Sequence, residues 1–414
     1  MRGMMPQIIM ALKKHIGSER FKEQARETEV DFTRNRKFQM QDYILTMIQR
    51  WGTSLAAMMR QYAEQMKVPA CTRQAYSQGR KRIKAEAIQG LIHSCAADLL
   101  KHAGRMKDWK GYQLLAIDGS RINLPDSAES REHFGIQKST GEQPQGLFSG
   151  IYDVLNRIFL DAELAPCAAS ERDLALRHVQ RVQDTFPSIL KNSIILFDRG
   201  YPSAELLWAI SEKLRGPKYL MRCCTEFIRG MKLSGNDCTI SYRFRKLDKE
   251  LKLRVIRFRL PDGRDEILLT NLFSKHLGMD DFKALYHLRW GIETAYNYLK
   301  NRLELENYSS VLPKGILQDT YAAIVMMYLL GFFLMDLRHA HPLSPDKAYN
   351  GSECFRILKE NLLRLFRCNS PDYDFFSRLL DIASIFYVYV RTGRHFERII
   401  RHKSARFHLN NRGS

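Results

Sequence analysis

The chain has 414 residues, and 45% of them are hydrophobic, which excludes an intrinsically disordered protein and suits roughly two to four domains with a sizeable core. Its formal net charge at pH 7 is +20. A positive surplus of this size on a folded chain favours a polyanionic partner, with nucleic acid as the first candidate and an anionic membrane surface as the second.

Cysteine usage and the apolar runs indicate a cytosolic protein. The eight cysteines include no Cys-x2-Cys pair and no cluster with histidine at zinc-finger spacing, so ordinary reduced core cysteines are the simplest interpretation. The apolar part of the N-terminal segment is too short for a signal peptide. The longest apolar run, Tyr321–Met335, falls short of the roughly 20 residues that span a bilayer, so we expect a buried core helix there.

Residues 1–110 predict a helical, basic region. Apolar residues recur there at spacings of three and four, and Lys and Arg outnumber Asp and Glu. Thr72 is a candidate N-cap for a short basic helix that carries Arg73, Arg80 and Arg82. Because this segment resembles a helix-turn-helix recognition element, the three arginines are candidate DNA contacts. A solvated basic helix face would show the same charge pattern.

The pattern changes at residue 111, where three strands are expected. Q-L-L-A-I-D-G-S is a short apolar run that ends in Asp118 and a glycine, which predicts a buried strand followed by a tight turn. Residues 146–153 and 157–164 predict two further strands with a short hairpin turn between them. An amphipathic helix follows over residues 170–184, and its opening S-E-R-D is a capping signal.

A second apolar run ends in the same way as the first. S-I-I-L-F-D-R-G-Y predicts a buried strand that ends in Asp198, and residues 203–214 are again helical. The order strand, strand, strand, helix, strand, helix matches the start of an RNase H-like domain. The first and fourth strands are neighbours in that arrangement, so Asp118 and Asp198 would converge.

Residues 216–273 predict an antiparallel β insertion. Strand-like segments occur there, some of them separated by glycine-containing turns. The segment L-R-V-I-R-F-R-L alternates cations with apolar residues, so one face would pack while the other presents Arg254 and Arg257 to DNA. For any single arginine of this segment, an ordinary solvated basic face is an equally good interpretation.

A spaced motif follows in Y-H-L-R-W-G-I-E-T-A-Y-N-Y-L-K, which we expect within one long helix over residues 280–303. Its four polar residues fall at offsets of three, four and seven, so a helix places them on one stripe. They are Tyr286, Arg289, Glu293 and Lys300. An ordinary ion pair would explain Arg289 and Glu293 but gives no role to the other two. Trp290 and Ile292 point elsewhere and are expected in the core.

Three acids on two strands and one helix suit metal-dependent phosphoryl transfer. That chemistry needs carboxylates that hold two divalent ions about 4 Å apart, one to activate a nucleophile and one to stabilise the leaving oxygen. Mg²⁺ prefers a few protein carboxylates together with substrate oxygens and water, so Asp118, Asp198 and Glu293 are the proposed ligands. Each acid taken alone is better explained as a turn-capping residue, and only the combination favours a catalytic site.

Together these motifs resemble those of the DDE transposases of bacterial insertion sequences, and within them insertion sequence family four. The resemblance covers roughly residues 32–335 and rests on D-G-S at 118–120, D-R-G-Y at 198–201, L-T-N-L at 269–272 and the spaced motif. It implies an α/β fold with an RNase H-like catalytic core that an antiparallel β insertion interrupts. It also implies metal ligation by the three acids, and contacts of Tyr286, Arg289 and Lys300 with transposon-end DNA.

The function that the resemblance implies is cut-and-paste DNA transposition. A nick at each transposon end would free a 3′-hydroxyl, which would attack the opposite strand, with a hairpin as one route, and later the target DNA. The expected cofactor is Mg²⁺, as two ions, with Mn²⁺ as a substitute. The expected partners are double-stranded DNA and a second copy of the chain in a synaptic complex. A metal-dependent nuclease without strand transfer and an inactive DNA-binding derivative are the alternatives.

The resemblance divides the chain into five parts and places it in the bacterial cytoplasm at the nucleoid, without membrane contact. Residues 1–110 would recognise the inverted repeats. The RNase H-like core would comprise residues 111–215 and 274–340, with the β insertion at residues 216–273. Residues 341–414 would form a helical C-terminal region with dimerisation or synapsis contacts and a basic, frayed tail.

Two departures from the family pattern are visible. Ser120 stands where threonine is common, a change that keeps the hydroxyl group. Some relatives stack a tryptophan of the β insertion on a flipped base during hairpin formation, but no tryptophan occurs between residues 214 and 283 of this chain. An aromatic residue that could stack instead is Phe244, Phe258 or Phe273.

Overall fold

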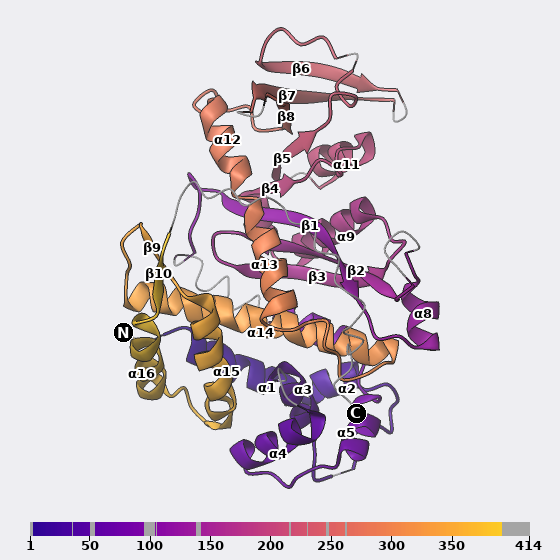
Figure 1. The fold of residues 1–414 in the computed structure, drawn as a ribbon, viewed down its shortest axis with the longest axis vertical. Coiled ribbons are helices and arrows are strands. Elements are labelled where there is room, and N and C mark those ends of the chain that lie inside the picture. The colour runs from indigo at the N-terminus through magenta and orange to yellow at the C-terminus, as the bar shows by residue number, and fades with distance from the viewer. Residues whose placement is uncertain are drawn as a thin grey trace.

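An eight-stranded mixed sheet runs through the part of the chain that the computed structural model describes, and helices lie around it (Figure 1). The described residues are 3–34, 36–49, 54–94, 104, 106–137, 142–214, 217–229, 231–245, 248–260 and 263–390. The strand order is β3-β2-β1-β4-β5-β8-β7-β6. The strands are β1 (Gln113–Asn123), β2 (Gln145–Asp153), β3 (Ile158–Pro166), β4 (Ser193–Phe197), β5 (Lys218–Cys223), β6 (Asp237–Phe244), β7 (Lys249–Arg259) and β8 (Asp265–Thr270).

The first five strands form one half of the sheet. β2 pairs antiparallel with both β1 and β3, whereas β4 pairs in parallel with both β1 and β5. Parallel neighbours need a crossover connection, and helices α9 (Glu171–Thr185) and α10 (Pro187–Lys191) precede β4 for that reason. Helix α11 (Ala204–Trp208) and a π-helical turn (Ala209–Lys213) lie between β4 and β5. The predicted order of three strands, a helix, a strand and a helix is found, except that a further helix, α8 (Ala128–Phe134), lies between the first two strands.

Strands β6, β7 and β8 extend the same sheet beyond β5 by antiparallel pairing. The prediction that residues 216–273 form an antiparallel unit is wrong for its first strand, because β5 pairs in parallel with β4. The segment Y-L-M-R of β5 is mostly buried, as expected for a strand with neighbours on both edges and cover on both faces. In Figure 1 these three strands lie at the end of the molecule farthest from the N-terminal helices.

The described N-terminal region is helical, as predicted. Its helices are α1 (Met5–Ile16), α2 (Glu19–Ala25), α3 (Met40–Gln49), α4 (Leu55–Met66), α5 (Arg73–Arg80) and α6 (Ala85–Ser94). Thr72 caps α5 as expected, since its hydroxyl accepts a hydrogen bond from the Ala75 backbone N–H at 3.2 Å. Helix α8 (Ala128–Phe134) lies between β1 and β2 in the chain.

Helix α14 (Pro313–Ala340) lies between the N-terminal helices and the sheet (Figure 1). It contacts β3 as well as α3 and α6. By length and composition the helix could cross a membrane, but its most apolar stretch is entirely buried inside the protein. The prediction of a buried core helix at this position is therefore confirmed.

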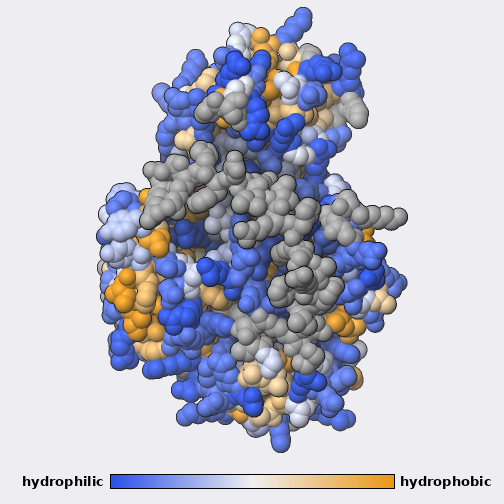
Figure 2. Space-filling model, in the orientation of Figure 1, coloured by the Kyte–Doolittle hydropathy of each residue, from blue (hydrophilic) through white to orange (hydrophobic). Residues whose placement is uncertain are grey.

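The C-terminal region contains α15 (Gly351–Arg367) and α16 (Tyr373–Ser384), followed by a strand rather than more helix. The helical prediction is wrong at β10 (Tyr387–Tyr389), which pairs antiparallel with β9 (Lys347–Tyr349). Alternating aromatic and β-branched residues favour a strand here. Exposed apolar side chains gather at this end, including Ile382, Ile385 and Val388, and Figure 2 shows an apolar surface on that flank. Residues 391–414, the predicted basic tail, lie outside the described residues.

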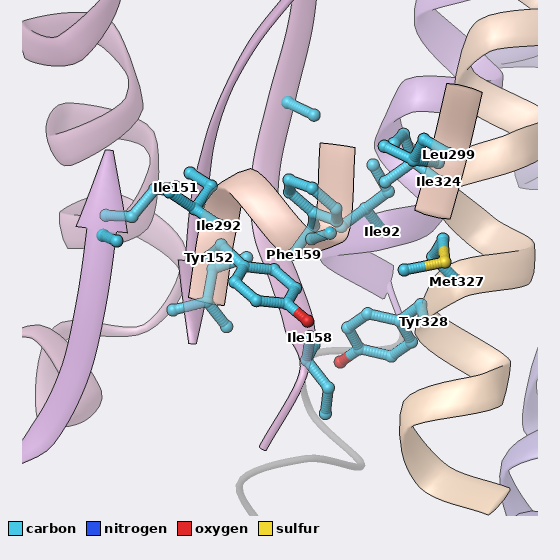
Figure 3. Packing of buried hydrophobic residues seen from close by; sticks show 14 of the residues in the cluster. Ile92, Ile151, Tyr152, Ile158, Phe159, Ile292, Leu299, Ile324, Met327 and Tyr328 are labelled. Carbon is cyan, nitrogen blue, oxygen red and sulfur yellow. The ribbon is translucent and has the colours of Figure 1, made fainter. Parts of the chain in front are cut away.

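One hydrophobic core attaches the motif-bearing helix to the sheet. Figure 3 shows Ile292 and Leu299 packing among side chains of the β2–β3 hairpin and of α14. Tyr152 and Phe159 of that hairpin are among the buried residues of this core. A buried side chain of this size contributes about 1.5–3 kcal/mol, so this packing fixes the position of the helix on the sheet.

The spaced motif lies on two helices rather than one. Helix α12 (Met279–His287) ends before Leu288, and α13 (Trp290–Asn301) begins after Arg289. The connection keeps helical backbone angles but uses short-range bonds, because the N–H of Arg289 donates to Tyr286 O at 3.0 Å. The prediction of one continuous helix over residues 280–303 is therefore wrong at this break.

Candidate active site

Asp118 and Asp198 lie at the same level of the sheet. The parallel ladder between β1 and β4 ends where Ile117 pairs with Phe197, and the two aspartates are the next residues along the chain. Neighbouring residues in register point to the same face of a sheet, so the two side chains converge as predicted. The predicted tight turn after Asp118 is wrong, because β2 continues to pair with β1 up to Asn123.

Helix α13 brings the third acid to the same place. The guanidinium of Arg289 donates from Nη2 to Glu293 Oε1 at 2.7 Å and from Nη1 to Asp118 Oδ2 at 3.5 Å. The Arg289 Nη2 also lies 3.9 Å from Asp198 Oδ1. The three acids that the sequence singles out therefore surround one cation.

Arg289 is a buried cation with an incomplete set of partners. Its side chain is only 4% exposed, and its Nε has no hydrogen-bond partner within the described structure. Burial disfavours its charge, but Tyr286 and the neighbouring carboxylates outweigh burial and raise the pKa of the guanidinium. Arg289 therefore stays charged and partly neutralises the acids.

The carboxylate of Asp118 is perturbed by its surroundings. Burial raises the pKa of Asp118 to about 6. The charge of Arg289 and the backbone N–H of Gly119, which donates to Asp118 Oδ1 at 2.9 Å, oppose this rise. Asp198 and Glu293 add to it through like-charge repulsion. One arginine does not neutralise three acids, and an excess of negative charge of this kind is typical of functional sites.

The other two residues of the spaced motif also reach the strand ends. The hydroxyl of Tyr286 donates to Asp198 Oδ1 at 3.3 Å. Lys300 Nζ donates to Ser120 Oγ at 2.7 Å and to the backbone carbonyl of Arg121 at 2.6 Å. Tyr286, Arg289 and Lys300 thus contact β1 or the residue that follows β4, although a helix break separates Tyr286 from the rest, and Glu293 is joined to them through Arg289.

Sequence reasoning missed Tyr296, which holds the backbone at the first acid. The Tyr296 hydroxyl donates to the carbonyl oxygen of Asp118 at 2.6 Å, and its ring stacks on Phe159 with centroids 6.2 Å apart. The signal was available, because Tyr296 lies three residues after Glu293 and shares its face of the helix. This contact restrains the backbone that carries Asp118.

The site offers the donor atoms that a divalent cation prefers, but its acids are too far apart in this structure to hold one ion. Its donors are carboxylate oxygens, which Mg²⁺ prefers. Within the described residues, no three acidic, histidine or cysteine side chains are close enough to hold a single ion. The acids are instead spaced around the guanidinium of Arg289, whose Nε is buried and unpaired. The oxygen donors are of the kind that a divalent cation prefers, and in this structure the guanidinium of Arg289 lies between them.

The prediction that Arg80 contacts DNA is wrong. Its side chain is buried, with Nη2 donating to Asp319 Oδ1 at 2.9 Å and Nε to Gln318 Oε1 at 2.8 Å. The same guanidinium also donates to the Ser309 hydroxyl and to the carbonyl of Gly315. Arg80 therefore joins α5 to α14, because its partners come from a segment more than 200 residues later in the chain.

The prediction for Arg254 is wrong for the same reason. Its Nε and Nη2 bind the Asp237 carboxylate at 2.7 and 2.6 Å, and Nη2 also donates to the carbonyl of Leu277 at 2.8 Å. The guanidinium lies 4.8 Å from the ring centroid of Phe282. Arg254 thus connects β7 and β6 to the start of α12 and presents no cation to solvent.

Three other arginines stay candidate DNA contacts. Arg73 is exposed on the first turn of α5. The Arg82 side chain is 41% exposed and lies 3.5 Å from Asp31, and that of Arg257 is 44% exposed beside Asp265. Ion pairs at this exposure are weak, so a DNA phosphate could replace either aspartate. Their contact with DNA stays a prediction.

The three phenylalanines that are candidates for stacking on a base differ in exposure. Phe244 and Phe258 are buried, whereas Phe273 is 40% exposed. Trp290 is 54% exposed, so its predicted place in the core is wrong, while Ile292 is buried as predicted. The two residues differ in their place on α13. Trp290 is the first residue of this helix, directly after the break, whereas Ile292 lies within its first turn.

Comparison with known proteins agrees with this arrangement. The family described as "Transposase DDE domain" matches residues 109–329, which is more than half of the chain and includes all three acids. The chain therefore belongs to the transposases with a DDE domain. Such a protein is an enzyme of DNA transposition and binds DNA.

Two curated relatives place it more narrowly. It is 21% identical over 351 residues to "Transposase InsG for insertion sequence element IS4" of Escherichia coli strain K12, a match that covers 80% of this chain and 77% of InsG. It is 33% identical over 145 residues to "Putative transposase InsZ" of the same strain, covering 34% of this chain and about half (46%) of InsZ. The chain is a DDE transposase of an insertion sequence, as the motifs predict.

A solved structure shows a weaker likeness. The piggyBac transposase synaptic complex with hairpin DNA aligns over 94% of this chain and 87% of that chain, with 9% sequence identity and a TM-score of 0.48. A likeness at this level does not establish a shared fold.

Proposed function

We propose that this transposase cuts DNA at the ends of its element by metal-dependent phosphoryl transfer at Asp118, Asp198 and Glu293. The observation that carries the proposal is the convergence of these acids on one guanidinium, with contacts of 3.5, 3.9 and 2.7 Å. Asp118 lies on β1, Asp198 directly follows the parallel strand β4, and Glu293 lies on α13. Two of the three acids are thus held by regular elements, which favours precise catalytic geometry.

We infer that β1 to β5 form an RNase H-like core. Their spatial order, in which β1 lies between β2 and β4 and β5 lies on the other side of β4, supports this assignment. Strands β6 to β8 pair antiparallel and lie between β5 and α12 in the sequence. They would then form the insertion, which starts later than the predicted residue 216.

The residues of the site have separable tasks in this mechanism. Two Mg²⁺ ions, for which Mn²⁺ would substitute, would supply activation of the attacking oxygen and stabilisation of the leaving oxygen. Asp118, Asp198 and Glu293 would hold them. Tyr296 restrains the backbone of Asp118, and Lys300 restrains β1 immediately beyond it. A displacement of about 1 Å in such a site can reduce the rate about 100-fold, so both contacts serve catalysis indirectly.

When DNA binds, Arg289 and Tyr286 would each leave their carboxylate partners and bind the DNA backbone instead. A guanidinium matches the geometry of phosphate as well as that of carboxylate. Since Arg289 is 4% exposed in this structure, contact with the DNA backbone requires its side chain to leave the acids. That exchange would free the carboxylates for metal at the moment when the DNA arrives.

The later steps concern strand transfer and assembly. A freed 3′-hydroxyl would attack the opposite strand and then target DNA, and Phe273 is the exposed member of the three phenylalanines that could stack on a flipped base if a hairpin forms. Joining two ends calls for two active sites, so we propose a homodimer in the synaptic complex. The exposed apolar residues of the C-terminal region support a contact surface there.

The test is end cleavage by Glu293→Ala. We expect wild-type protein to cleave DNA that carries the element's terminal repeats in the presence of Mg²⁺, and we expect the variant to bind the same DNA with cleavage reduced by at least about 1,000-fold. Thr294→Ala, at the exposed neighbouring position of α13, is the matched control. Unchanged cleavage by Glu293→Ala would refute the assignment.

A further inference from the structure

A buried serine of β2 holds the backbone of the first acid. Ser149 is fully buried, and its hydroxyl donates to the carbonyl oxygen of Asp118 at 3.2 Å. The Tyr296 hydroxyl donates to the same oxygen at 2.6 Å. In the antiparallel ladder Ser149 pairs with Gly119, whose face of the sheet is opposite to that of the Asp118 side chain. Ser149 therefore restrains Asp118 through the backbone and from the face away from the carboxylate.

Two further buried side chains fix the Ser149 hydroxyl. His178, on helix α9, is fully buried, and its Nε2 lies 3.1 Å from Ser149 Oγ. Its Nδ1 lies 2.6 Å from Oδ2 of Asp161, a fully buried residue of β3. Because each ring nitrogen of His178 has a partner, the imidazole is held in one orientation, and so is the hydroxyl that it contacts.

Asp161 attaches this chain of contacts to two helices. Its Oδ1 lies 3.1 Å from His93 Nε2 on α6, and Arg181 of α9 donates from Nη1 to Asp161 Oδ2 at 3.2 Å. Burial disfavours the charge of Asp161, but the hydrogen bonds of His178 and His93 outweigh burial and hold the pKa of this carboxyl well below its usual range. Asp161 is therefore an ionised acceptor with several partners, which makes it a rigid end of the chain.

Ser149, His178 and Asp161 have the connectivity of a serine–histidine–aspartate triad, but their burial excludes that role. The serine of a triad attacks substrate, so its hydroxyl has to reach the substrate. Ser149 is 0% exposed, and its hydroxyl donates to the Asp118 carbonyl instead. The arrangement can thus fix the strand but does not reach a DNA phosphate.

We propose that Ser149 and His178 are positioning residues for DNA cleavage, which hold the Asp118 backbone so that its carboxylate meets metal and DNA in one geometry. This inference rests on the proposed function. In this structure the Asp118 carboxylate also contacts Arg289, at 3.5 Å. When Arg289 leaves the acids to bind DNA, that restraint is lost, and the contacts to the Asp118 carbonyl remain. The buried chain therefore matters most in the complex that cleaves.

Strand β4 supplies a matched control. Ser193 is also fully buried, and its hydroxyl donates to a backbone carbonyl, that of Leu190, at 2.7 Å. Ser149→Ala and Ser193→Ala each remove one buried hydroxyl from a carbonyl oxygen, so they should lower the melting temperature by similar amounts. Ser149 contacts a residue of the active site, whereas Ser193 contacts Leu190. A difference in cleavage between the two variants thus reports positioning rather than stability.

The experiment is single-turnover cleavage of transposon ends by the full chain over a range of Mg²⁺ concentrations. We expect Ser149→Ala to cleave about 10-fold more slowly than wild type, and to need several-fold more Mg²⁺ for half of its maximal rate. Ser193→Ala should match wild type in both quantities, and neither variant should change DNA affinity. A loss of stability alone would not change the Mg²⁺ requirement.

A second variant tests whether the contacts act as one chain. The side chain of His178→Asn keeps an N–H donor for Asp161 but is too short to reach Ser149 as well. We expect it to slow cleavage about as much as Ser149→Ala does. The double variant should be no slower than either single variant, because one break already interrupts the chain. Losses that multiply in the double variant would overturn the proposal.

Asp118→Asn, measured in parallel, separates failure of this inference from failure of the proposed function. If Asp118→Asn abolishes cleavage while Ser149→Ala cleaves like Ser193→Ala, the positioning role is overturned and the three-acid site stands. If Asp118→Asn cleaves as fast as wild type, the proposed function itself is overturned, and the role of Ser149 and His178 falls with it.

Discussion

Two buried arginines join helices to the rest of this protein in different ways. At the junction of α5 with α14, each guanidinium nitrogen of Arg80 has a partner, and among the described residues its acidic partner is Asp319. At the junction of α13 with the sheet, Arg289 lies among three carboxylates, yet its Nε is unpaired. Both side chains are about 95% buried.

The difference teaches how to distinguish a structural cation from a functional one. In a buried ion pair whose cation already has a partner at each nitrogen, a further partner adds no hydrogen bond. Such a pair holds two elements of the fold together. A buried cation that faces excess negative charge with an unused donor can exchange partners at low cost. Arg80 therefore belongs to the fold, whereas Arg289 belongs to the site.

The largest expected effect is on stability at the first junction. Arg80→Ala leaves the Asp319 carboxylate buried without its cation, which should cost about 3–5 kcal/mol of unfolding free energy. Urea denaturation measures this loss. Arg73→Ala, which removes an exposed arginine at the other end of α5, should change stability by no more than about 0.5 kcal/mol. Equal effects of the two variants would remove the distinction between a structural and a surface arginine.

At the second junction the prediction concerns pH. The pKa of Asp118 is raised to about 6 in the folded state from about 3.8, so this group contributes stability that is fully present below pH 3.8 and is lost as pH rises through 6. The shift corresponds to about 3 kcal/mol. We expect the difference in unfolding free energy between wild type and Asp118→Asn to shift in favour of wild type as pH falls from 7 to 4. A pH-independent difference would contradict the raised pKa.

A metal effect should separate the two arginines. Arg289→Ala leaves three carboxylates facing one another, which should cost about 1–3 kcal/mol. These acids are partly exposed, with side-chain exposures of 18, 42 and 25%, so a divalent cation can replace the guanidinium. Millimolar Mg²⁺ should therefore raise the melting temperature of Arg289→Ala and leave that of Arg80→Ala unchanged. The same response in both variants would mean that Arg289 is as structural as Arg80.

The smallest effect is expected for a surface arginine. Arg82→Ala should weaken DNA binding several-fold and lower the slope of log affinity against log salt by about 1, because one phosphate contact is lost. Arg356→Ala, at an exposed arginine of α15 that pairs with Glu353, is the matched control and should change neither quantity. A salt slope that Arg82→Ala leaves unchanged would exclude this residue from the DNA contact.

The acids could be predicted from the sequence because their positions follow from local pattern. Two apolar runs that each end in aspartate and then reach a glycine mark two buried strands, and parallel neighbours bring equivalent ends together. Glu293 follows from helical spacing that survives the break, since α13 carries it together with Lys300. The element order also predicted the sheet as far as β4.

What could not be predicted depends on contacts distant in sequence. From the sequence, an arginine in a basic helix is a reasonable candidate for a DNA contact. The acidic partner of Arg80, Asp319, lies 239 residues later in the chain, so local sequence does not reveal it. The break between α12 and α13 was not predicted, although Gly291 lies directly beside it, and Trp290 was therefore placed in the core.

Metal specificity after Asp198→Cys tests the central claim most directly. The claim is that these acids bind a divalent cation for DNA cleavage. A thiolate is a poor ligand for Mg²⁺ and a better one for softer cations. We predict that wild type cleaves transposon ends with Mg²⁺ or Mn²⁺, while Asp198→Cys is inactive with Mg²⁺ and recovers cleavage with Mn²⁺. Equal loss of cleavage with both ions, in a variant that still binds DNA, would contradict metal ligation by Asp198.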